Sequence, residues 1–179
     1  MVLGACHTGP MVPTQMTVAG AVMEQDGDLL LVQNRRRNGA HDWSTPGGVV
    51  DSTDSSVLAG LTREVEEETG LIVRTWDGPL YEVNAIALDM GWQMRCEVHR
   101  AVEFDGDLRI DDPDGIVVDA GFFGPSHVDE RLADCFRWVR DPLAAWLGER
   151  WAPSAPRRFT YEVRGTSLAS FEVVSVSTG

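Results

Sequence analysis

The sequence predicts one domain of the α/β class, and three observations support this. The chain has 179 residues, which is enough for a single domain with a full hydrophobic core. Short apolar segments bounded by Gly, Pro, Asn or Asp predict strands on both sides of one segment with helical spacing. With 43% hydrophobic and 24% charged residues, the composition is that of a folded globular protein.

The first third of the chain is predicted to form strands separated by turns. A Gln-Asp-Gly-Asp turn signal at 25–28 separates two apolar segments, and Gly and Pro residues without periodicity occupy the N-terminus. In chain order, the expected segments are a flexible lead-in at 1–15, strands at Thr17–Met23 and Leu29–Val32, a basic loop at Asn34–Gly39, and a Gly-rich turn at Trp43–Gly48.

A helix is predicted at Ser55–Thr69. Its apolar residues recur at helical spacing and fall on one side, and Gly70 is well placed to end it. After Gly70 the pattern returns to strands, and Asp141 and Pro142 predict the N-cap and first residue of a later helix. The expected segments are strands at Leu71–Trp76, Tyr81–Leu88, Gln93–Phe104 and Ile116–Phe123, an acidic loop at 105–115, and helices at Val128–Ala133 and Pro142–Trp151.

The last segment, 152–179, is predicted to be a hairpin appended to a main domain at 16–151. Two strand-like stretches, Arg158–Arg164 and Ala169–Ser177, flank Gly165-Thr166-Ser167. Such a hairpin extends the sheet, forms a dimer contact or acts as a lid. A possible homodimer follows from the exposed edge that it would present.

Charge, cysteine content and the length of the apolar runs argue against several classes of function. The formal net charge is −13, and all fifteen basic residues are arginine. This disfavours binding to a nucleic-acid backbone, so handling phosphates requires a cation or a local Arg cluster. No apolar run is long enough to span a membrane, and no secretory signal is visible. Three widely spaced cysteines fit a reducing cytoplasm better than a disulfide scaffold.

The predicted helix carries a cluster of acidic residues. At 3.6 residues per turn, Glu64, Glu67 and Glu68 share one face at the edge of the apolar stripe, whereas Glu66 points towards solvent. These like charges repel one another, and they lie near the helix end where the dipole favours cations. A bound Mg²⁺ or Mn²⁺ removes both penalties, since these ions prefer carboxylate oxygens. The alternative is a solvated acidic face.

The same segment resembles the Nudix box of Nudix hydrolases. That box is a Gly, five residues, a Glu, seven residues, and then Arg-Glu-aliphatic-x-Glu-Glu-x-Gly-aliphatic, which Arg63–Leu71 matches at every defined position. Gly48 matches the first position. The resemblance extends over roughly residues 16–150. There are two departures: Asp54 stands for the first Glu, and eight residues separate it from Arg63, which predicts a bulged loop before an intact helix.

The resemblance implies an α/β/α sandwich with a mixed sheet that binds Mg²⁺ and hydrolyses a nucleoside diphosphate linked to a group X. The implied metal ligands are the Gly48 carbonyl and the carboxylates of Glu64, Glu67 and Glu68. The implied catalytic set is Glu64, Arg63 and Glu67. Arg63 orients Glu64, and the general base is supplied either by Glu64 or by an arrangement with a metal-bound water. A last acidic ligand often comes from a distant loop or strand, and its candidates are Asp112, Asp114 and Asp119.

Candidate substrate-binding residues are Arg35, Arg37 and Trp43. The two arginines either meet substrate phosphate or balance an acidic surface, and Trp43 either stacks on a base or packs in the core. The substrate class stays open among a nucleoside triphosphate, an oxidised nucleotide and an ADP-ribose type compound. An alternative function is a nucleotide-sensing module that does not hydrolyse its ligand, for which the extra residue before the helix is the only support.

Overall fold

The computed structural model describes residues 13–167 and 170–179. Most of the predicted lead-in lies outside these residues, although Thr14 and Gln15 already belong to the first strand. A six-stranded mixed sheet has the order β10-β9-β6-β7-β1-β5, with β1 parallel to β7 and β6 parallel to β9. Its strands are β1 (Thr14–Val22), β5 (Gly47–Val49), β6 (Ile72–Ala87), β7 (Trp92–Asp105), β9 (Arg157–Ser167) and β10 (Ser170–Thr178).

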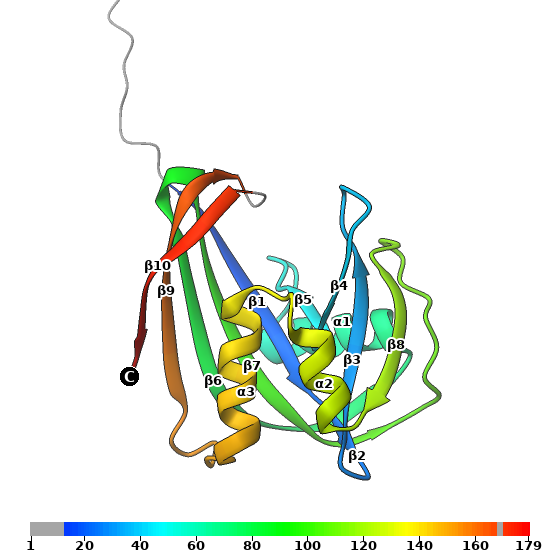
Figure 1. Cartoon of the computed structure of the whole chain (residues 1–179). Helices are drawn as coiled ribbons and strands as arrows, with labels where there is room; N and C mark the ends of the chain where they lie inside the picture. The colour runs from blue at the N-terminus through cyan, green and yellow to red at the C-terminus, as the bar shows by residue number, and fades with distance from the viewer. Residues whose placement is uncertain (1–12, 168–169) are drawn as a thin grey trace, which may run out of the picture.

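A second sheet forms around β3, which pairs with β2, β4 and β8 (Figure 1). The remaining elements are β2 (Glu24–Gln25), β3 (Asp28–Arg35), β4 (His41–Ser44), β8 (Val117–Phe123), the helices α1 (Val57–Thr69), α2 (Pro125–Leu132) and α3 (Arg137–Glu149), and the 3₁₀ turn η1 (Leu88–Met90). No helix among the described residues is both long and apolar enough to cross a membrane.

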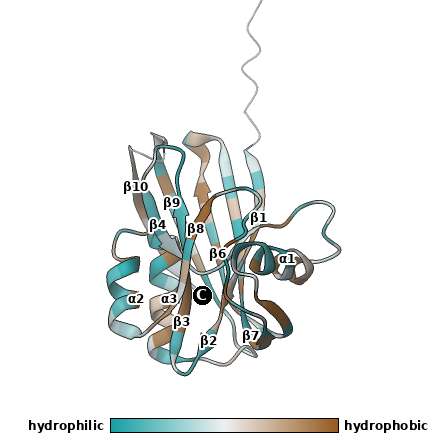
Figure 2. Cartoon of the chain, turned by 90° about the vertical axis from the view of Figure 1, so that its right-hand side faces the viewer, coloured by the Kyte–Doolittle hydropathy of each residue, from teal (hydrophilic) through white to brown (hydrophobic). Residues whose placement is uncertain are grey.

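The helices cover opposite sides of the strands (Figure 2). On one side α1 contributes Leu61 and Val65 to a core cluster with Ala19 and Leu30. On the other side α2 and α3 contribute a larger cluster that includes Val128, Leu132, Trp138, Leu143 and Trp146. The predicted α/β/α sandwich with a mixed sheet is therefore confirmed, and α1 reaches the strands from the side opposite α2 and α3.

Helix α1 ends at the predicted residue, Thr69, and begins at Val57, two residues after the predicted start at Ser55. The hydroxyl of Ser56 accepts a hydrogen bond from the Ala59 N–H at 3.1 Å and caps the N-terminus. Gly70 adopts a left-handed conformation with φ 73°, and its N–H donates to the Glu66 carbonyl at 2.8 Å. These two capping contacts fix where the helix begins and ends.

The structure corrects the prediction of two separate strands at Leu71–Trp76 and Tyr81–Leu88. A single strand, β6, runs through this segment, and the pairing with β7 is irregular between Asp77 and Tyr81. Pro cannot donate to a strand ladder, so a bulge at this place lets the strand continue on both sides of Pro79.

The predicted start of the last helix is also wrong. Helix α3 begins at Arg137, so Pro142 lies inside it and Asp141 is not its N-cap. The preceding turn forms because Trp138 is buried and stacks on Phe136, with ring centroids 4.6 Å apart. Arg137 donates to the carboxylate of Asp141 at 3.0 Å and holds this turn together. Burial of Trp138 thus outweighs the hydrogen bond that Pro142 cannot donate.

The predicted C-terminal hairpin forms and joins the main sheet, because β9 pairs in parallel with β6. Ala169, the predicted start of its second strand, lies outside the described residues. Phe159, Tyr161 and Val163 of β9 are buried in the larger core cluster. Of the three expected roles of the hairpin, the pairing supports a sheet extension.

Tyr161→Phe is expected to stabilise the protein. Tyr161 is fully buried, and within the described part of the chain its hydroxyl has no hydrogen-bond partner. Removing a buried, unpaired hydroxyl recovers about 1 kcal/mol of unfolding free energy. Thermal denaturation measures the change, and a lower melting temperature would mean that the hydroxyl has a partner in solution.

Candidate active site

Arg63 is the centre of the acidic cluster on α1. Its Nη1 donates to Glu64 at 2.9 Å and to Glu67 at 3.1 Å, and its Nη2 donates to Asp54 at 3.0 Å. Asp54 and Glu64 raise the pKa of the guanidinium, with the hydrogen bond to Asp54 as the largest contribution. One guanidinium therefore fixes two glutamates of the helix and one aspartate of the preceding loop.

Asp54 occupies the loop between β5 and α1, where the sequence predicts the extra residue. Its Oδ2 also accepts the N–H of Asp51 at 2.8 Å, and its Oδ1 accepts from Arg63 Nε at 3.3 Å. The hydrogen bond from Arg63 holds the pKa of Asp54 below its usual range. The helix is regular from Val57 to Thr69, so the loop contains the departure from the spacing.

The two glycines of β5 lie directly against the glutamates. The Gly47 N–H donates to Glu68 Oε2 at 2.8 Å. A Cβ placed on Gly48 would stand 2.5 Å from Glu64 Oε2, so any other residue at this position would push the carboxylate away. The Gly-rich turn therefore lets the backbone of β5 approach the acidic face of α1.

Burial sets the electrostatics of these carboxylates. Glu68 is 8% exposed, and desolvation raises its pKa to about 8 despite the hydrogen bond from Gly47. Desolvation also raises the pKa of Glu64, against the opposing effect of Arg63. A buried carboxylate among other negative charges is the kind of group that a divalent cation stabilises.

Two of the three candidates for a further acidic ligand lie near the cluster. The charge of Asp112 acts on Glu68, and that of Asp114 acts on Glu64. Asp112 Oδ2 accepts the N–H groups of Ile116 and Val117 at 2.7 and 2.8 Å, which shapes this loop. Asp119 lies in β8, and its carboxylate accepts the N–H of Ala120.

The candidate substrate-binding residues lie at three different places. Arg35 ends β3, and its Nη2 donates to the Gly115 carbonyl at 2.9 Å, in the loop that carries Asp114. Arg37 lies in the exposed turn after β3. Trp43 packs edge-on against Phe123, with ring centroids 5.2 Å apart. The structure thus connects Arg35 to the acidic site and places Trp43 against the core.

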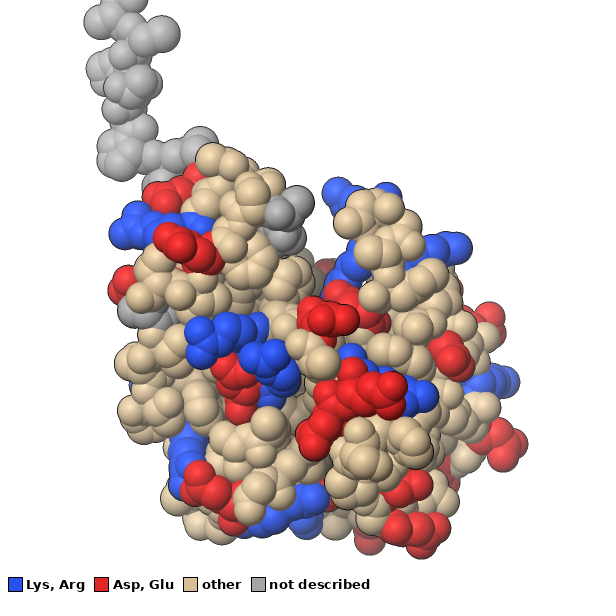
Figure 3. Space-filling model, viewed as in Figure 1, with Lys and Arg blue, Asp and Glu red and all other residues tan. Residues whose placement is uncertain are grey.

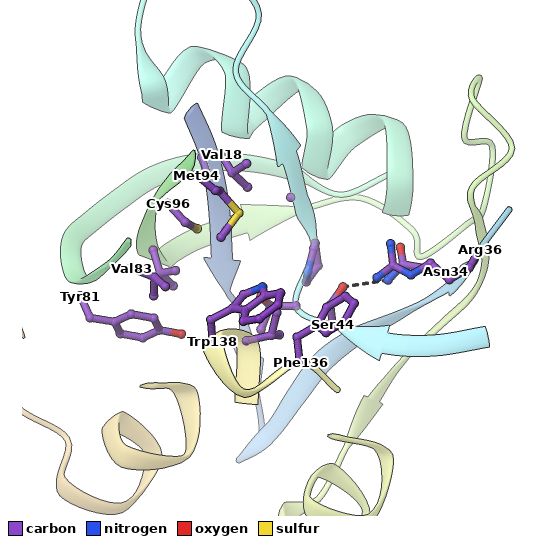
Figure 4. Close-up of a pocket in the computed structure, with 17 residues that line it drawn as sticks. Val18, Asn34, Arg36, Ser44, Tyr81, Val83, Met94, Cys96, Phe136 and Trp138 are labelled. Carbon is purple, nitrogen blue, oxygen red and sulfur yellow. Dashed lines mark hydrogen bonds between the residues drawn. The ribbon is translucent and has the colours of Figure 1, made fainter. Parts of the chain in front are cut away.

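A cavity of about 290 Å³ adjoins Gly47. Figure 4 shows Tyr81, Met94, Phe136 and Trp138 around it, with Asn34 and Ser44 at another side. Asn34 Nδ2 donates to Ser44 Oγ at 2.9 Å. The space-filling view in Figure 3 shows the molecule hollowed between the β9–β10 hairpin and the turn after β3. No motif in the sequence predicts this cavity, since its walls come from distant segments.

The donor set fits a hard divalent cation, although the described residues contain no preformed group of three His, Cys, Asp or Glu side chains that would hold one. Arg63 binds Glu64 and Glu67 in the structure, while Glu68 is bound by Gly47. The chemistry of the set is nevertheless that of Mg²⁺ or Mn²⁺, because all of its donors are oxygen. The raised pKa of the buried Glu68 carboxylate shows that its negative charge lacks compensation, which a cation would supply.

Comparison with known proteins agrees with this geometry. The family model of the NUDIX domain matches residues 13–147. The crystal structure of a MutT NUDIX hydrolase from Burkholderia pseudomallei is 31% identical, with a TM-score of 0.54, over 62% of this chain and 84% of that one. The NUDIX domain of Shewanella oneidensis NrtR, solved as a complex with ADP ribose, is 19% identical, with a TM-score of 0.59, over 77% and 88%.

A curated protein of Xenopus laevis, nucleoside diphosphate-linked moiety X motif 6, is 43% identical over 58 residues. The match covers 32% of this chain and only 26% of the length of that relative. The fold, the acidic helix and the family match together define a NUDIX-domain protein, and the chain belongs to this family.

Proposed function

We propose that this protein hydrolyses a diphosphate bond in a nucleoside diphosphate linked to a group X, in a reaction that depends on Mg²⁺. The observation that carries the proposal is the arrangement at α1. Arg63 joins Glu64, Glu67 and Asp54, while Glu68 is buried against Gly47. Carboxylates held beside Gly47, whose backbone also lines the cavity, suit a site where a cation and a phosphate meet.

Each residue of the site has a distinct role in this proposal. Glu64, Glu67, Glu68 and the Gly48 carbonyl would hold the cation, and Mn²⁺ is a possible substitute for Mg²⁺. When bound, the ion neutralises phosphate charge and lowers the pKa of water. Glu64 accepts the proton of the attacking water, and Arg63 orients the Glu64 carboxylate through its 2.9 Å hydrogen bond. Asp114 is the proposed further acid, because the carboxylate of Asp112 already accepts the backbone N–H groups of Asp114, Ile116 and Val117.

The cavity beside Gly47 is proposed to receive the nucleoside. Aromatic and thioether side chains at Phe136, Trp138 and Met94 provide an apolar surface for a base, and Asn34 and Ser44 provide hydrogen-bonding groups. Arg35 and Arg37 lie on the β3 side and are proposed to meet phosphate. Of the two roles expected for Trp43, stacking on a base or packing in the core, its contact with Phe123 favours packing.

The rival function is a nucleotide sensor that does not hydrolyse its ligand. The extra residue before α1 is its support in the sequence. In the structure the extra residue lies in the loop and leaves the helix regular, and Asp54 still accepts a hydrogen bond from Arg63 at 3.0 Å. The acidic set of a hydrolytic site is therefore intact, which favours hydrolysis over sensing.

A substrate panel with and without Mg²⁺ is expected to separate these functions. Nucleoside triphosphates, an oxidised nucleotide and ADP-ribose are incubated with the protein, and phosphate, pyrophosphate and monophosphate products are scored. Hydrolysis of at least one compound is expected with Mg²⁺ and should fall to background with a chelator. Tight binding of a nucleotide without cleavage of any would favour the sensor. Light scattering on the same samples tests the predicted homodimer.

A further inference from the structure

Gly60 occupies an unusual place for a glycine. It lies in the second turn of α1, with neighbours that favour a helix, and it is buried. Glycine in a helix interior is less favourable than alanine, because it loses more backbone freedom on folding. Neither a left-handed conformation nor a turn requires it here. The reason for a glycine at this position therefore lies in what is packed against it.

The group packed against Gly60 is the carboxylate of Asp54. A Cβ built on Gly60 would lie 2.7 Å from Asp54 Oδ2 and 3.2 Å from Asp54 Cγ. The side chain of Val50 closes the other side, with Cγ1 3.3 Å from the same point. The carboxylate thus sits on the bare backbone of α1, in a space that a methyl group would fill.

Because it packs against Gly60, the carboxylate of Asp54 lies within hydrogen-bonding distance of Arg63. From this position Oδ2 accepts from Arg63 Nη2 at 3.0 Å, and Oδ1 accepts from Arg63 Nε at 3.3 Å. An aspartate has one methylene less than a glutamate, so it must come closer to the helix to make the same paired contact. The missing side chain at Gly60 permits this approach.

We propose that Gly60 is a positioning residue for the metal-binding glutamates and acts through Asp54 and Arg63. The absent side chain lets the short carboxylate of Asp54 hold one edge of the guanidinium, and the guanidinium then holds Glu64 and Glu67. The extra residue in the loop, the aspartate in place of a glutamate and the glycine in the helix therefore compensate for one another. This inference rests on the proposed function, because it assigns Gly60 to the same site.

Gly60→Ala tests the proposal, with Gly148→Ala in α3 as the matched control. Within the described part of the chain, no atom lies within 4 Å of a Cβ built on Gly148. We expect Gly60→Ala to weaken Mn²⁺ binding about tenfold, as loss of a group that orients ligands does, and to lower kcat. The control should keep the Mn²⁺ affinity and the kcat of the wild type. Unchanged Mn²⁺ affinity in Gly60→Ala would overturn the proposal.

A double-mutant cycle separates positioning from a purely structural role. In the Asp54→Ala background the clash with the carboxylate is gone and only the contact with Val50 remains, so adding Gly60→Ala should raise the melting temperature by about 3 °C, as for a helix glycine. In the wild-type background this gain should be reduced or absent, because the methyl group displaces Asp54 from Arg63. Equal shifts in both backgrounds would refute the coupling. Asp54→Ser replaces Asp54→Ala if the latter does not fold.

The cycle is measured by unfolding of the metal-free protein, so it does not depend on hydrolysis. Coupling between Gly60 and Asp54 without cleavage of any compound in the panel would refute the proposed function and leave the packing relation standing. Cleavage without coupling would refute the role of Gly60 and leave the proposed function standing. The two failures are therefore distinguishable.

Discussion

Glu67→Gln and Glu68→Gln are each expected to lower kcat about 10³-fold while the protein stays folded. Each change removes one charged oxygen donor from the proposed cation site, where several kcal/mol of charge stabilisation are at stake. The amide that replaces the Glu68 carboxylate keeps an oxygen that can accept the Gly47 N–H, so the backbone contact at 2.8 Å survives. Steady-state kinetics at saturating Mg²⁺ measure the loss.

Glu66→Gln is the matched control, because Glu66 is an exposed residue on the same helix as the glutamates of the proposed site. It removes the same charge from that helix and should leave kcat within about twofold, as an exposed charge does. Wild-type turnover in Glu67→Gln or Glu68→Gln would refute the ligand assignment. Equal losses in all three variants would point to the net charge of the helix instead.

Glu68→Gln is expected to stabilise the metal-free protein relative to wild type at high pH but not at low pH. Burial raises the pKa of Glu68 to about 8 in the folded protein, so its ionised form opposes folding. This penalty is absent below the unfolded pKa and complete above about pH 8. Metal-free Glu68→Gln should therefore melt at a higher temperature than wild type at about pH 9, with the difference vanishing near pH 4.

Helix α1 shows how much of the site is encoded locally. The apolar spacing, the cap at Ser56 and the stop at Gly70 all act within a few residues, so the sequence predicts the helix and its acidic face. The contact between Glu68 and Gly47 is not local, since 21 residues separate the two. The resemblance to a Nudix box places the neighbouring Gly48 carbonyl with the glutamates but does not predict the Gly47 contact, and periodicity alone predicts neither.

The cavity walls show what the sequence could not predict. Phe136 and Trp138 lie at the start of a helix that the sequence predicts to begin only at Pro142. Their position depends on packing against Phe171 and Trp92, which lie in distant strands. The choice between Asp112 and Asp114 likewise depends on the fold of the 106–116 loop, for which the sequence has no periodic pattern.

Arg63→Ala is expected to lower kcat and Mn²⁺ affinity by about 10²-fold and also to lower the melting temperature. Without the guanidinium, Glu64 and Glu67 lose their shared donor, and Asp54 loses both of its hydrogen bonds to the helix. The three carboxylates then repel one another without the positive charge that lies between them. Kinetics, Mn²⁺ titration and thermal unfolding of the same preparations measure the three effects.

Arg63→Lys distinguishes the charge of the arginine from its shape. A lysine keeps the positive charge but presents a single ammonium group, whereas Arg63 uses Nε and Nη2 on Asp54 and Nη1 on Glu64 and Glu67. We therefore expect the melting temperature to be largely restored and kcat to stay at least about tenfold below wild type. Full activity in Arg63→Lys would mean that charge alone suffices. Arg74→Ala is the control, because its pair with Asp105 is exposed and its loss should change neither quantity.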